Sequence, residues 1–229
     1  MVNIKLILKL LLSRFPSIFE IVYKYFSKNR SHLVSKRKNL VIEGFPRSGN
    51  TFATETIKYA NNYKLYIANH LHLPAQLYLA QKYGIPTYIV IREPISSIAS
   101  LLIRNSKLNA KIALYYYIEF YKTVIKYKKS VIIGNFENLI DDMEKEIKRI
   151  NKKYNTNFLI FHHNNDSVKI IFDRLEKSEK NKRKDYELFM SRPSEKRKDL
   201  KNDKIYKIKK EYKLLRRAKK LYDEINKNE

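Results

Sequence analysis

The chain has 229 residues, of which 44% are hydrophobic and none is cysteine. This length suits one domain with helical additions, the hydrophobic fraction excludes wholesale disorder, and the lack of cysteine excludes disulfides and thiolate metal sites. Lys and Arg number 48 against 23 Asp and Glu, a net charge of +25 that favours an anionic partner.

Residues 1–38 form a basic N-terminal extension with a single acidic residue. Its first apolar run is interrupted by Lys5 and Lys9, so it is too short and too charged to span a bilayer, and no signal-peptide cleavage pattern follows it. We interpret residues 4–26 as amphipathic and helical. Two interpretations stay open: packing against the domain, which we favour, and peripheral contact with a membrane surface. We expect a cytoplasmic protein, either free or at a membrane surface.

Residues 39–229 form the second predicted unit, in which short apolar runs alternate with helical patterns. The apolar runs suit buried strands at 39–43, 65–68, 86–91 and 130–136. Helical spacing follows them at 51–62, 74–83, 94–103, 109–128 and 137–154, and the charged tail ends in one long predicted helix at 198–226. This alternation predicts an α/β domain with a central parallel sheet of about four to five strands, helices on both faces, and N- and C-terminal helical extensions.

A phosphate-binding loop is predicted at residues 44–51, between the first strand and the first helix of the domain. Gly44 and Gly49 have the spacing of a Walker A loop, whose backbone N–H groups converge with a helix N-terminus on one anion. Asn50 stands where an NTPase needs lysine, which counts against ATP or GTP hydrolysis. Arg47 can supply the missing charge, and Thr51 can donate its hydroxyl to a phosphate oxygen. The alternative is a strand-to-helix turn without a ligand.

Further candidate residues follow two other predicted strands. Arg92 stands at a strand's carboxyl end, where open parallel sheets bind ligands, and Ser100 lies two helical turns later. A structural ion pair is the alternative role for Arg92. His70 and His72 follow the strand at 65–68, and a neutral imidazole can take a proton from a hydroxyl group. No carboxylate or third ligand is close to them in sequence, so we expect no metal site.

The segment from Phe45 to Phe52 resembles the 5′-phosphosulfate loop of sulfotransferases that use 3′-phosphoadenosine 5′-phosphosulfate (PAPS), where Pro-Lys-Ser-Gly-Thr-Thr-Trp is typical. This chain has Arg47, Asn50 and Phe52 where that family has Lys, Thr and Trp. The resemblance covers residues 39–222 and is strongest at 44–52, 72–74 and 92–100.

Three other segments are similar to elements of the same family. Arg92 with Ser100 resembles its 3′-phosphate element, His72-Leu73-Pro74 its catalytic histidine motif, and 135–139 a segment with an adenine-binding aromatic residue. Residues 191–197 are similar to its basic closing loop, although Arg-Lys-Gly is absent. The nucleotide contacts that the resemblance implies are Arg47, Ser48, Gly49, Asn50, Thr51, Phe52, Arg92, Ser100, Phe136, Arg192 and Arg197.

The resemblance implies a three-layer, P-loop-like fold and the transfer of a sulfuryl group from PAPS to a hydroxyl acceptor, either a glycan or a small molecule. Adenosine 3′,5′-bisphosphate (PAP) would be the second product, and no metal would be required. His72 would be the general base, favoured over His70 by its spacing to Pro74, and Arg47 would stabilise charge on the departing phosphate. Two rival hypotheses are a P-loop kinase and a non-catalytic binder of nucleic acid or anionic membranes; we expect no specific nucleic-acid partner.

Overall fold

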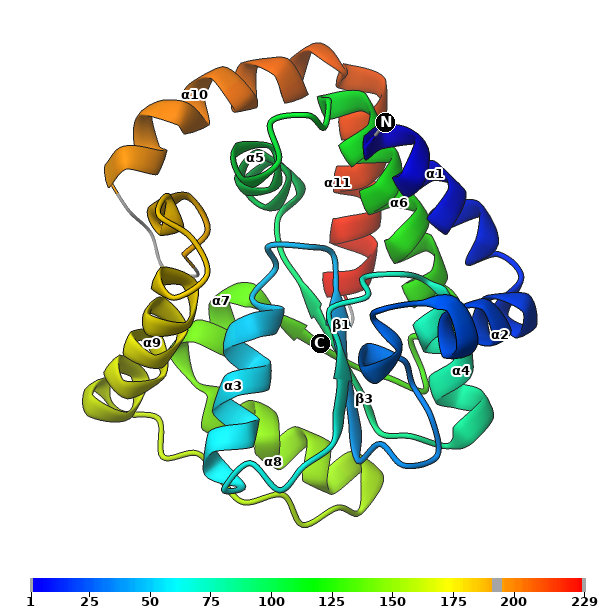
Figure 1. The fold of residues 1–229 in the computed structure, drawn as a ribbon, viewed down its shortest axis with the longest axis vertical. Coiled ribbons are helices and arrows are strands. Elements are labelled where there is room, and N and C mark those ends of the chain that lie inside the picture. Colours follow the sequence, from blue (N-terminus) through cyan, green and yellow to red (C-terminus); the bar gives the residue numbers. More distant parts are fainter. Residues whose placement is uncertain (1, 191–194, 228–229) are drawn as a thin grey trace.

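The computed structural model describes residues 2–190 and 195–227, with backbone only at 2, 3, 188 and 195–199. Its centre is a parallel sheet of four strands in the order β2-β1-β3-β4 (Figure 1). The strands are β1 (Leu40–Gly44), β2 (Ile67–Asn69), β3 (Thr87–Ile91) and β4 (Ile132–Asn135). All three pairings are parallel, so the carboxyl ends of the strands share one edge. The predicted α/β class and strand number are confirmed.

Helices cover both faces of this sheet and make a three-layer fold. One layer contains α3 (Asn50–Ala60), α7 (Phe136–Asp141), α8 (Met143–Tyr154) and α9 (Asn165–Lys180). The other contains α4 (Ala75–Tyr83), α5 (Pro94–Arg104), α6 (Ala110–Lys126) and α11 (Tyr212–Asn226), with α10 (Glu195–Lys210) packed on α5. Because both faces are buried, successive side chains of β3 pack into opposite layers, which explains its unbroken apolar run.

The N-terminal extension consists of α1 (Val2–Leu12), α2 (Pro16–Phe26) and the 3₁₀ turn η1 (Arg30–His32). These elements pack against the α/β domain, with α1 on α6 and α2 on α4. Ser13 Oγ accepts a hydrogen bond of 2.7 Å from the Ala75 N–H, and Phe19 and Tyr23 are buried. The extension is therefore attached through one face of each helix.

Two helices predicted as continuous are each divided in the structure. The pattern at 137–154 forms α7 and α8, because Asp142 has a non-helical backbone and its carboxylate accepts the Lys145 N–H. The pattern at 198–226 forms α10 and α11, with Glu211 between them. This second break lets α11 pack chiefly along α6 while α10 packs chiefly on α5.

Candidate functional site

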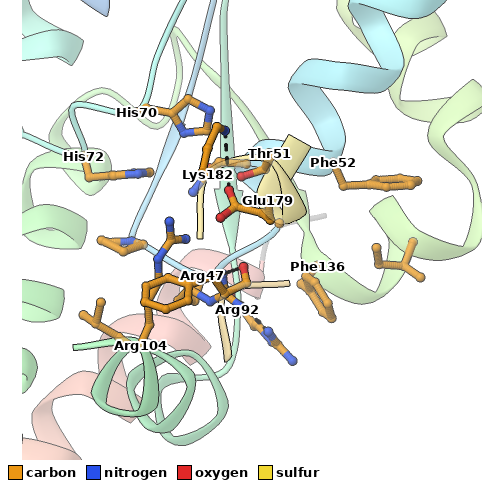
Figure 2. A pocket seen from close by; sticks show the side chains of 16 residues that line it. Arg47, Thr51, Phe52, His70, His72, Arg92, Arg104, Phe136, Glu179 and Lys182 are labelled. Carbon is orange, nitrogen blue, oxygen red and sulfur yellow. Dashed lines mark hydrogen bonds and ion pairs between the residues drawn. The ribbon is translucent and has the colours of Figure 1, made fainter. Parts of the chain in front are cut away.

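A cavity of about 460 Å³ lies at the carboxyl edge of the sheet and brings the separate predicted motifs together (Figure 2). Its lining includes nine of the residues that the sequence singled out: Arg47, Gly49, Asn50, Thr51, Phe52, His70, His72, Arg92 and Phe136. Two more predicted contacts, Ser48 and Ser100, lie beside the cavity without lining it. Arg192 lies outside the described residues, and Arg197 belongs to α10 with only its backbone described.

The loop between β1 and α3 needs both of its glycines. A Cβ on Gly44 would lie 2.2 Å from the carbonyl oxygen of Val90, so only glycine permits this approach of β1 to β3. Gly49 has a φ of +99° and caps α3 without a side-chain hydrogen bond. The first N–H groups of α3 therefore carry no side-chain cap, which is the arrangement that favours an anion at a helix N-terminus.

Two loop side chains stabilise the loop itself. Ser48 is fully buried, with its Oγ 3.5 Å from the hydroxyl of Tyr121. Asn50 is also buried, and its Nδ2 donates a hydrogen bond of 3.0 Å to the Phe45 carbonyl. The residue in the Walker lysine position thus holds the loop's own backbone. Phe52 is 2% exposed and stacks on Phe172, with ring centroids 5.2 Å apart.

Arg92 is a cation with few partners at the wall of the cavity. Its Nη1 donates a hydrogen bond of 3.0 Å to the Arg47 carbonyl, and its guanidinium lies 3.8 Å from the ring centroid of Phe136. Its Nε is buried without a hydrogen-bond partner, and no carboxylate in the described residues forms an ion pair with it. Burial lowers the pKa of Arg92. Glu137 and Glu93 oppose this shift from a distance without pairing with Arg92. A partly desolvated cation with no ion-pair partner favours an anionic ligand.

Arg47 crosses from the loop to the opposite wall. Its backbone has a φ of +71°, and its Nε donates a hydrogen bond of 3.0 Å to Ser100 Oγ in α5. Its Nη2 donates to the carbonyl of Met190 at 2.7 Å. Ser100 therefore contacts Arg47, whereas the resemblance implied a contact with the same phosphate as Arg92.

His72 is held in one tautomer by its surroundings. Its Nδ1 lies 2.8 Å from the carbonyl oxygen of Gly44, which can only accept, so Nδ1 carries the proton and Nε2 is left as an acceptor. The Glu43 carboxyl accepts the backbone N–H groups of Leu71 and His72, both at 3.0 Å, and Tyr116 donates its hydroxyl to the His72 carbonyl at 2.7 Å. These bonds fix a backbone with a φ of +54°.

Burial keeps both histidines neutral near pH 7. Desolvation lowers the pKa of His72 to about 4 and that of His70 to about 3. It also raises the pKa of the buried Glu43 carboxyl to about 7. A neutral His72 with a free Nε2 can accept a proton, and an anion bound beside it would raise its pKa by stabilising the imidazolium. His70 has no hydrogen-bond partner in the described chain, and its ring lies 5.8 Å from that of His72.

Four other polar or aromatic residues of the lining were not predicted as site residues. Arg104 ends α5, whereas Glu179, Lys182 and Phe189 belong to the end of α9 and the segment after it. Arg104 lies four residues after Ser100, on the same helix face, and this spacing could have identified it. The other three stand in a charged tail whose sequence shows no motif. Arg104 has no hydrogen bond or ion pair within the described residues, which adds a second cation open to a ligand.

The partly buried, desolvated His70 imidazole gives a testable pH dependence. The unfolded chain protonates His70 near pH 6.5 while the folded protein keeps it neutral to about pH 3, so stability is full above pH 6.5 and falls on acidification. At pH 5 the loss relative to pH 8 is about 2 kcal/mol for this one residue. Urea unfolding measures this loss as the fall in the free energy of unfolding from pH 8 to pH 5. That fall should be about 2 kcal/mol larger for the wild type than for His70→Asn. Asn tolerates the φ of +61° at this position.

The raised pKa of Glu43 changes stability with pH in the opposite direction. The folded state holds the Glu43 proton more tightly, so this contribution to stability is lost as the pH rises from about 4.5 to 7. Glu43 is present in both proteins, so its contribution cancels in the difference between them. An identical pH dependence for wild type and His70→Asn would show that His70 protonates freely in the folded state.

No protein-family model matches the chain, and no match is found among the curated proteins. The fold and the cavity define a three-layer α/β protein with a candidate anion-binding site at the carboxyl edge of its sheet. The function must therefore be inferred from the site.

Proposed function

We propose that this chain is a PAPS-dependent sulfotransferase that transfers a sulfuryl group to a hydroxyl acceptor, either a glycan or a small molecule. The observation that carries the proposal is the convergence of Arg47 and Arg92 on one cavity that also contains His72. Two arginines from separate motifs suit a ligand with two separated anionic groups. An ATP-dependent enzyme would need the lysine that Asn50 replaces, and here the Asn50 side chain binds the loop backbone instead.

In this proposal the donor lies across the cavity. The loop and the N-terminus of α3 hold the 5′-phosphosulfate, and Arg47, which lines the same cavity, stabilises negative charge on the leaving phosphate. The Arg92 guanidinium, which lines the same cavity, binds the 3′-phosphate. Phe136, already stacked on Arg92, presents an aromatic edge for the adenine. The two arginines thus bind opposite ends of one nucleotide.

The reaction is an in-line displacement at sulfur. The acceptor oxygen forms a new S–O bond while the bond between sulfur and the 5′-phosphate oxygen breaks, and PAP leaves with the electron pair. The acceptor proton passes to Nε2 of His72, which the Gly44 carbonyl has left free to accept it. The products are a sulfate ester and PAP. The residues contribute mainly position and electrostatic stabilisation.

Nucleotide binding tests the proposal directly. At a PAP concentration about 100 times the Kd, the free energy of unfolding should rise by about 2.7 kcal/mol, which corresponds to about 5–10 °C in Tm for a chain of this size. ATP with Mg²⁺ at the same concentration should shift Tm by less than about 2 °C. A larger shift with ATP and Mg²⁺ than with PAP would instead support a kinase. Conversion of PAPS to PAP that depends on an added acceptor would then test catalysis.

A further inference from the structure

The outer side of the N-terminal helices exposes an unusual number of large apolar side chains. Nine of them, between residues 4 and 26, are 42–81% exposed: Ile4, Ile7, Leu8, Leu11, Phe15, Ile18, Ile21, Tyr25 and Phe26. The four on α1 follow the 3–4 residue spacing of a single helix face. We call these nine residues the α1–α2 apolar face.

This face is separate from the one that attaches the helices to the domain. Leu6 and Leu10 of α1 pack on the hydrophobic core, and Phe19 and Tyr23 of α2 are buried in it. Each helix thus has one apolar side against the protein and a second that remains in water. Both helices lie at the same edge of the molecule, on the side opposite α9 (Figure 1). The fold therefore buries only part of the apolar surface of the two helices.

Positive charge accompanies the apolar face. Lys5, Lys9, Lys24 and Lys28 are exposed, and none of them forms an ion pair in the described structure. Glu20 is the one acidic residue among residues 1–38, and it is occupied by Lys82 and Tyr83 of α4. The surface therefore combines large apolar side chains with uncompensated lysines, which is the composition of helices that lie in the interface of anionic membranes.

We propose that the α1–α2 apolar face docks the protein on the surface of an anionic lipid bilayer. In this arrangement the apolar side chains enter the boundary between headgroups and acyl chains, and the lysines bind lipid phosphates. A second copy of the chain fits this face less well, because a twofold contact would bring the same lysines together on proteins that each carry a charge of +25. In the described part of the chain no helix has the length and apolarity to cross a membrane, so contact would be at the surface.

Vesicle sedimentation with the full-length protein tests the proposal. We expect binding to vesicles of phosphatidylcholine with 30% phosphatidylglycerol, and at least tenfold weaker binding to phosphatidylcholine alone or in 0.5 M salt. The double variant Leu8→Asp/Ile21→Asp should lose at least tenfold in affinity. Both side chains are more than half exposed, so its Tm should stay close to that of the wild type.

The matched control is Leu159→Asp/Tyr212→Asp, which adds the same charge at two exposed apolar residues outside the N-terminal helices. This control should bind vesicles like the wild type. An equal loss of vesicle binding in both double variants would show that only the net charge matters, and would overturn the proposal. Sedimentation-equilibrium data showing a dimer that only Leu8→Asp/Ile21→Asp disrupts, without vesicle binding, would assign the face to a second copy. Equal binding to neutral vesicles would overturn the requirement for anionic lipid.

Discussion

Replacing His72 with asparagine is expected to lower kcat by about 10²- to 10⁴-fold while changing the affinity for PAP less than about threefold. The reason is that the two ring nitrogens have different roles. Nδ1 is bonded to the Gly44 carbonyl and supports the loop, whereas Nε2 accepts the acceptor proton. Asparagine can place its amide donor where Nδ1 stands, lacks any group at Nε2, and tolerates the φ of +54°. Single-turnover kinetics with PAPS and isothermal titration with PAP measure the two quantities.

His70→Asn is the matched control, because it makes the same chemical change at the neighbouring imidazole, also with positive φ. We expect this variant to keep more than about a third of the wild-type kcat, since general-base catalysis would reside in His72. Loss of turnover in His70→Asn with an active His72→Asn would exchange the two roles. Equal loss of PAP binding and turnover in His72→Asn would show that the imidazole supports the loop without acting as a base.

The architecture was predictable because the sheet is buried on both faces. Each strand is then a short, largely apolar run in the sequence, and all four predicted runs lie within two residues of the observed strands at both ends. The two helix breaks were harder to predict from the sequence. Asp142 is a helix-capping residue that was read as part of a continuous helix, and the break at Glu211 depends on how α10 and α11 pack on α5 and α6. Such packing is a tertiary property and leaves no local sequence signal.

The sequence predicted many of the residues that line the candidate site, but not the contacts among them. Parallel strands bring their carboxyl ends to one edge, so Arg47, His72 and Arg92 could be expected in one place. Sequence spacing could not show that Ser100 contacts Arg47, or that the Ser48 hydroxyl points into the core. These details follow from side-chain direction, which depends on a loop with positive φ at Arg47 and Gly49.

Glu43 shows a further limit of sequence reading. It ends a predicted apolar strand and would ordinarily be assigned to solvent. In the structure it is fully buried, and its two carboxyl oxygens accept backbone N–H groups from Leu71 and His72. This residue therefore connects β1 to the histidine segment and sets the position of the candidate base relative to the phosphate loop. Only the three-dimensional neighbourhood reveals such a positioning role.

Replacing Arg92 with alanine is expected to weaken PAP binding by about 10- to 150-fold, which corresponds to about 1.5–3 kcal/mol for a hydrogen bond to a charged group. The loss should depend on the 3′-phosphate. Adenosine 5′-monophosphate lacks that group, so its affinity should change less than about threefold in the same variant. Isothermal titration of both nucleotides against wild type and Arg92→Ala gives the four values needed. The exposed Arg14→Ala, at a side chain paired with Glu119 outside the cavity, is the control for lost positive charge.

The side-chain contacts of Arg92 also predict how Arg92→Lys should compare with Arg92→Ala. Arg92→Lys keeps the charge but loses the planar group that stacks on Phe136 and the fixed fork that donates to the Arg47 carbonyl. Its affinity for PAP should therefore fall between those of the wild type and Arg92→Ala, with little change in Tm without ligand. An equal loss for PAP and adenosine 5′-monophosphate in Arg92→Ala would place the side chain at the 5′ end or in a structural role. If the nucleotide occupies two distinct anion sites, the Arg92→Ala variant should instead lose affinity for PAP and keep its affinity for adenosine 5′-monophosphate.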